Sequence, residues 1–182
     1  MTLAAGLWST IQGQAWDDLR TPATAIPIRG QSGDPDADVD GTLLFDASTA
    51  EQVALLFQLP HAWEHGTGVR FHIHWAKTTD AAGDVEWEYR YRRWANGAVA
   101  PAWSDWVAAT TRNQDIAADQ ATLIDGWPEL SMTGHIGSCL LSIQLRRNPD
   151  ATNDNYAADA RLYDADCHYR VWGLGSEREY PS

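Results

Sequence analysis

The chain has 182 residues, of which 44% are hydrophobic and 21% are charged, which is enough apolar content for one domain with a sizeable core. Its formal net charge of −12 repels phosphate-bearing partners, so we expect no direct binding to nucleic acid and none to membranes. No apolar run approaches the length of a membrane span, and the start lacks a signal-peptide pattern. These features predict a protein made in a cytoplasm.

Residues 1–33 show little sustained periodicity, and Pro22 and Pro27 disfavour helix within them. We expect an extended N-terminal arm with Trp8 and Trp16 among its anchors, packed on its own domain or on a neighbouring subunit. Residues 34–182 are then expected to form a single domain.

An acidic loop at residues 34–41 follows the arm. Asp36, Asp38 and Asp40, closed by Gly41, match the opening of a calcium-binding loop. The twelfth position of such a loop needs a bidentate glutamate, and here it is Ala47. A solvated acidic loop is therefore the preferred interpretation, with a Ca²⁺ site of another type as the alternative.

The clearest strand pattern lies at residues 66–76, where side chains alternate between two faces. The apolar face, expected to join the core, carries Val69, Phe71, Ile73 and Trp75. The polar face carries Arg70, His72 and His74.

The next strand is expected at residues 84–94, with a polar row of Glu86, Glu88, Arg90 and Arg92. We predict that it forms an antiparallel hairpin with the strand at residues 69–75. Such a hairpin would set the two polar rows side by side.

Further strands are expected at residues 42–45, 53–59, 103–109, 121–124, 138–147 and 160–172, with a helix at 116–124 as an alternative. The last strand carries a polar row of Asp164, Asp166, His168 and Arg170, and it sets Tyr163 on the core face. Cys139 and Cys167 are expected to be buried thiols rather than a disulfide. About eight strands with turns between them predict an all-β, jelly-roll-like antiparallel β-sandwich.

His72 and His74 stand two apart on one strand face, a spacing from which two imidazoles can bind one metal. With Gly66 they also keep the spacing of the first cupin motif. The glutamate of that motif is missing, and no second motif follows, so a histidine pair at a structural or intersubunit contact is preferred over a catalytic metal.

Other catalytic signatures are lacking: the sequence has no nucleophile elbow, phosphate loop or zinc-binding cysteine cluster. Stacking of loop tryptophans on sugars would indicate a carbohydrate-binding module. Packing is the preferred role for most of the aromatic residues.

Several short segments resemble small β-rich virion structural proteins of tailed bacteriophages. They are Trp16-Asp-Asp-Leu-Arg20, Gln58-Leu-Pro-His-Ala-Trp63, His72-Ile-His-Trp75 and Asp164-Ala-Asp-Cys-His-Tyr169. The resemblance implies a virion subunit that decorates or cements a capsid or forms part of a tail, made in the bacterial host cytoplasm. It supplies no catalytic residues.

We therefore expect a non-enzymatic virion protein without a cofactor, forming a homo-oligomer, with a trimer as the expected form, and binding other capsid or tail proteins. A cupin-like metal-dependent enzyme using His72 and His74 is the first alternative, and a carbohydrate-binding module is the second. The expected interface residues are Trp8, Trp16, Arg70, His72, His74, Glu86, Glu88, Arg90, Arg92, Asp164, Asp166, His168 and Arg170.

Overall fold

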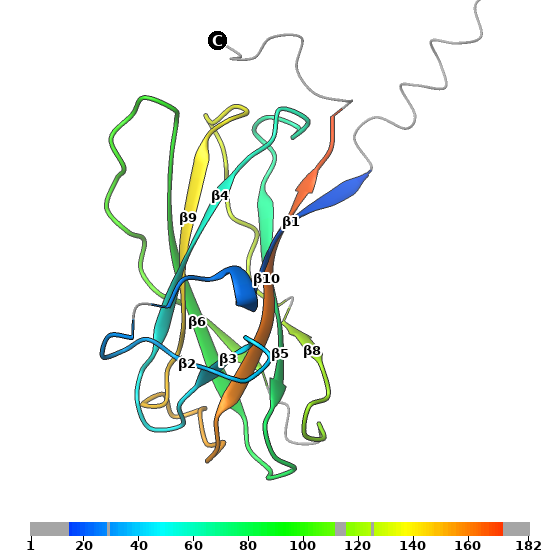
Figure 1. The fold of residues 1–182 in the computed structure, drawn as a ribbon. Helices are drawn as coiled ribbons and strands as arrows, with labels where there is room; N and C mark the ends of the chain where they lie inside the picture. The colour runs from blue at the N-terminus through cyan, green and yellow to red at the C-terminus, as the bar shows by residue number, and fades with distance from the viewer. Residues whose placement is uncertain (1–14, 29, 112–115, 125, 173–182) are drawn as a thin grey trace, which may run out of the picture.

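The computed structural model describes residues 15–28, 30–111, 116–124 and 126–172, without the side chains of residues 110 and 111 (Figure 1). The arm residue Trp8 lies outside these ranges. The elements within them are β1 (Trp16–Pro22), the 3₁₀ helix η1 (Ala23–Ala25), β2 (Asp36–Ala37), β3 (Leu43–Phe45), β4 (Gln52–Gln58), β5 (Val69–Lys77), β6 (Val85–Trp94), β7 (Val107–Thr111), β8 (Thr122–Ile124), β9 (Leu140–Arg147) and β10 (Ala160–Arg170).

The strands form two antiparallel sheets that pack face to face. Sheet A has the order β2-β3-β10-β5-β8, with β1 also paired to β10, and sheet B has the order β4-β9-β6-β7. From β3 to β6 and again from β7 to β10, each strand lies in the opposite sheet from the one before it, whereas β6 and β7 are neighbours in sheet B; this is the jelly-roll order. The predicted all-β antiparallel sandwich is confirmed.

The core lies between the two sheets and is built from alternate residues of each strand. Val69, Phe71, Ile73 and Trp75 of β5 are all buried, as the alternation predicts. From sheet B, Trp87 meets the ring of Trp75 at 6.0 Å and that of Phe45 at 4.9 Å, both edge to face. Aromatic contacts of this kind join the sheets.

The predicted hairpin between the strands at residues 69–75 and 84–94 is wrong. β5 pairs with β10 and β8 in sheet A, whereas β6 pairs with β9 and β7 in sheet B. The connection between β5 and β6 crosses from one sheet to the other, so the apolar faces of the two strands meet across the core.

Strand β10 is the centre of sheet A. One edge pairs with β5, and the other pairs with β3 at its start and with β1 along its second half. The register with β5 shifts between Leu162 and Asp164, so Tyr163 lies in a bulge and is only half-buried rather than in the core. Beyond the bulge, Ala165, Cys167 and Tyr169 face inward.

Both cysteines are free and buried, as expected. Burial raises the pKa of Cys139 to about 11 and that of Cys167 well above its usual value. At residues 116–121 the chain has no helix, and the short strand β8 follows. Among the described residues, no helix is long and apolar enough to cross a bilayer.

Candidate functional site

The outer face of sheet A gathers most of the polar residues singled out in the sequence. The register pairs His72 with Asp166, His74 with Asp164, and Arg70 with His168. The predicted row on β10 therefore lies beside the polar row of β5.

Asp166 is at the centre of this face, with its side chain only 3% exposed. Its Oδ1 lies 3.7 Å from His72 Nδ1, and its Oδ2 lies 3.7 Å from His74 Nε2 and 3.5 Å from His168 Nε2. The rings of His72 and His168 are edge to face, with centroids 4.1 Å apart. Three imidazoles thus surround one buried carboxylate, which we call the Asp166 cluster.

Strand β1 completes the cluster from the opposite edge of β10. The register places Asp18 beside His168 and Pro22 beside Asp164. Asp18 Oδ1 lies 3.0 Å from His168 Nε2, and Arg20 Nε donates to Asp164 Oδ2 at 3.0 Å. Asp18 and Arg20 are not among the interface residues expected from the sequence, because this segment was predicted to be an arm without a defined strand partner.

One end of the same face carries an aromatic contact between β1, β5 and β10. The indole of Trp16 is 40% exposed, and the guanidinium groups of Arg70 and Arg170 lie 5.1 Å and 5.5 Å from its ring. Arg70 also lies 3.6 Å from a carboxylate oxygen of Glu129. Trp16, Arg70 and Arg170 therefore form one surface with the cluster.

The polar row of β6 lies on sheet B, so it does not extend this face. Glu88 accepts a hydrogen bond from Arg146 at 2.6 Å, and Arg90 donates to Gln144 at 2.7 Å. Glu86, which belongs to the same predicted polar row, is only 4% exposed. The polar row of β6 therefore makes its contacts with β9 in sheet B.

Two tryptophans from the loop before β7 lie on the arginines of sheet B. Trp106 contacts Arg90 at 4.6 Å and Arg146 at 4.0 Å, while Trp103 contacts Arg92 at 4.4 Å. These distances fit cation–π contacts. Packing against guanidinium groups thus gives the loop residues Trp103 and Trp106 a structural role.

The acidic loop holds its carboxylates in local hydrogen bonds. Asp40 Oδ1 accepts hydrogen bonds from the amide and hydroxyl of Thr42, and these bonds hold the pKa of Asp40 below its usual value. Asp38 pairs with Arg161 at 2.7 Å, and Asp36 begins β2. Among the described residues, the one group of three close metal-ligand atoms belongs to His72, Asp166 and His168. Calcium at residues 34–41 stays a prediction.

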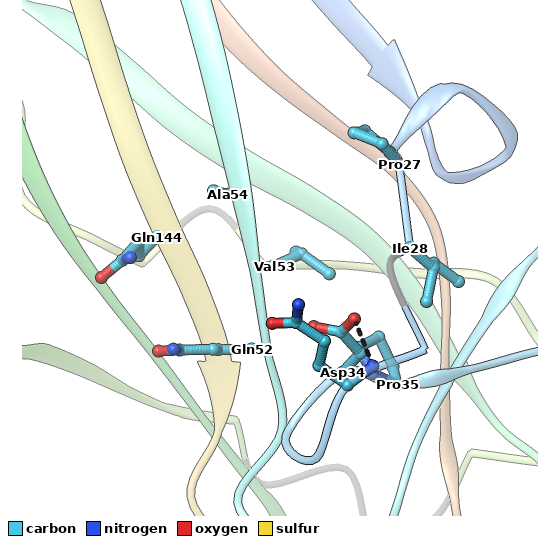
Figure 2. A pocket seen from close by; sticks show the side chains of 9 residues that line it. Pro27, Ile28, Asp34, Pro35, Gln52, Val53, Ala54 and Gln144 are labelled. Carbon is cyan, nitrogen blue, oxygen red and sulfur yellow. Dashed lines mark hydrogen bonds between the residues drawn. The ribbon is translucent and has the colours of Figure 1, made fainter.

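A pocket of about 240 Å³ lies beside strand β4 (Figure 2). Gln52, Val53 and Ala54 line it from the strand, and Pro27, Ile28, Gln31, Asp34 and Pro35 line it from the segment after η1, with Gln144 from β9. Asp34 accepts a hydrogen bond from the Gln31 amide at 3.1 Å and closes the turn on that side. Asp34 and Pro35 belong to the acidic loop at residues 34–41, whereas none of the predicted interface residues lines this pocket.

Comparisons with known proteins find similarity only among solved structures. No protein-family model matches the sequence, and no curated protein does. Two chains from structures of infectious bursal disease virus, strains Gx and Gt, are 9% and 8% identical, with a TM-score of 0.43 each. They match 93% and 89% of this chain, which spans about a third of their own length.

Two carbohydrate-related structures are also similar. A ruminal GH26 endo-β-1,4-mannanase is 10% identical with a TM-score of 0.38, matching 90% of this chain and 26% of its own. TmCBM61, solved with β-1,4-galactotriose, is 11% identical with a TM-score of 0.34, matching 90% of this chain and 93% of its own. Matches this distant assign no function to the chain.

Proposed function

We propose that the chain is a non-enzymatic structural subunit of a virion, which forms a homo-oligomer and attaches to other capsid or tail proteins. The resemblance of its short motifs to tailed-phage virion proteins supports this role. The observation that carries it is the exposed edge of strand β4. A subunit of this kind works by burying matched surfaces against its neighbours.

Among the described residues, strand β4 is the end strand of sheet B, and β9 is the only strand that pairs with it. Gln52 N donates to Gly33 O at 2.8 Å on the side away from β9, and among the described residues no other backbone hydrogen bond reaches that side of β4. Alternate residues of an antiparallel strand direct their backbone groups to the same side. Ala54, Leu56 and Gln58 therefore turn their N–H and C=O groups toward the open edge.

This edge lacks the features that normally keep edge strands apart. The segment Gln52–Gln58 contains no charged residue and no proline, although the whole chain carries a net charge of −12. Leu56 is 62% exposed on its outer face. A second copy can approach this uncharged strand without the repulsion that its other surfaces would impose.

We therefore assign the β4 edge to self-association. Two β4 strands that pair with each other give a two-fold dimer, whereas the expected trimer requires β4 to pair with a different surface of the next copy in a closed ring. In either arrangement Leu56 lies beside the neighbouring copy. The pocket beside Val53 and Ala54 lies along the same edge and gives room for a side chain of the neighbouring copy.

The substitution Leu56→Lys tests this assignment. Lysine on an edge strand opposes pairing, and its side chain points to solvent, so the fold is expected to survive. In sedimentation analysis, the wild-type chain should form a defined oligomer, and Leu56→Lys should sediment as the 20.2 kDa monomer.

The matched control is Val99→Lys, which adds the same charge at a loop residue that is 93% exposed. It should leave the oligomer intact. A wild-type chain that stays monomeric at all concentrations would contradict self-association, and an unchanged oligomer in Leu56→Lys would remove β4 from the interface.

A further inference from the structure

We propose that the Asp166 cluster binds one divalent transition-metal ion through His72, Asp166 and His168. The ligand atoms of these residues all lie within 4.8 Å of one another. They come from the neighbouring strands β5 and β10, whose register places His72 opposite Asp166. The inference rests on this cluster and does not depend on the proposed virion role.

The distances within the cluster fit shared coordination better than direct hydrogen bonding. Asp166 oxygens lie 3.5–3.7 Å from the three imidazole nitrogens, beyond the usual hydrogen-bond range. Two ligands bound to one tetrahedral Zn²⁺ at its normal bond lengths are about 3.3 Å apart. The three ligand atoms lie within 4.8 Å of one another, so side-chain rotations that draw them closer would bring all three to one ion.

The burial of Asp166 is the second observation that indicates a cation. Its Oδ1 is buried and accepts no hydrogen bond from any described residue. A carboxylate oxygen in that position carries a large desolvation cost unless a positive charge or a donor compensates it. The guanidinium of Arg20 donates to Asp164.

The local charge agrees with a divalent ion. Asp18, Asp164 and Asp166 lie around the cluster, and Arg20 pairs with Asp164. Two imidazoles and one carboxylate form a ligand set suited to Zn²⁺, Fe²⁺ or Mn²⁺, whereas Ca²⁺ and Mg²⁺ prefer oxygen ligands only. His74 and Asp18 lie close enough to orient the ligands or add to them.

Metal analysis of the full chain, purified without chelators, tests the proposal. Elemental mass spectrometry should find one zinc, iron or manganese ion per chain. After chelation, titration with Co²⁺ should restore one ion per chain and give visible absorption bands that report imidazole ligation. Titration with Ca²⁺ provides the comparison and should give binding at least tenfold weaker than Zn²⁺.

Variants then show whether the ion is at this site. Asp166→Asn, which keeps the shape of the side chain, and His168→Ala should each weaken Zn²⁺ binding at least tenfold. His135→Ala, at a half-buried histidine outside the cluster, should leave it unchanged. If Asp166→Asn does not fold, His168→Ala and His72→Ala, at the two imidazole ligands, decide the assignment.

Two results would overturn the proposal. The first is a folded wild-type chain that takes up no stoichiometric Zn²⁺ or Co²⁺. The second is undiminished uptake in the folded cluster variants, which would place the ion elsewhere.

Discussion

Replacement of Arg147 by alanine is expected to lower the free energy of unfolding by about 3–5 kcal/mol, because it leaves a buried charge without its partner. The Arg147 side chain is fully buried, and it donates to Asp154 at 2.7 Å and 2.8 Å. It also donates to the backbone carbonyls of Phe45, Tyr156 and Ala158. One guanidinium thus ties the loop after β9 to the end of β3.

Chemical denaturation of Arg147→Ala and wild type measures this effect. The adjacent Arg146→Ala is the matched control, because Arg146 is partly exposed and pairs with Glu88 at the surface of sheet B. Its cost is expected to be about 1 kcal/mol or less. Equal losses of unfolding free energy in the two variants would show that the buried Arg147 contacts do not stabilise the fold more than a surface ion pair does.

Replacement of Trp87 by alanine is expected to cost about 3–5 kcal/mol, since it opens a cavity between the two sheets. Trp87 has no exposed surface, and it contacts Phe45 and Trp75 of the facing sheet. Its loss removes aromatic contacts that join sheet B to sheet A.

Thermal and chemical unfolding of Trp87→Ala should both show this loss. Trp172→Ala is the control, because Trp172 is 53% exposed, and a cost below about 1 kcal/mol is expected for it. A Trp87→Ala protein as stable as Trp172→Ala would contradict the packing described for the core.

Side-chain alternation predicted much of the fold. On β5, the residues Val69, Phe71, Ile73 and Trp75 alternate with polar ones, and all four are buried. Alternation assigns a residue to a face, because the period of a strand is two. It carries no information on which strand lies beside it, so β6 was wrongly paired with β5.

The candidate site was predicted in part for the same reason. His72, His74, Asp166 and His168 each lie on the expected face of their strand. The contribution of Asp18 and Arg20 depends on the pairing of β1 with β10, two segments far apart in the sequence. Long-range pairing of this kind leaves no local pattern, and the bulge at Tyr163 leaves none either.

The β4 edge and the Asp166 cluster lie on different sheets of the sandwich. The edge offers unpaired backbone groups and an exposed leucine, which suits contact with another protein chain. The cluster joins β5 to β10 within one subunit. We therefore expect assembly and metal binding to be separable, so that Leu56→Lys retains the metal and His168→Ala retains the oligomer.

The most direct test of the proposed virion role is the composition of purified particles of the phage that this proposal takes to encode the chain. Quantitative mass spectrometry should find the chain in washed particles, in a fixed multiple-copy ratio to the major capsid or tail protein. Recovery of the chain only from the infected-cell lysate, with none in the particles, would contradict the account.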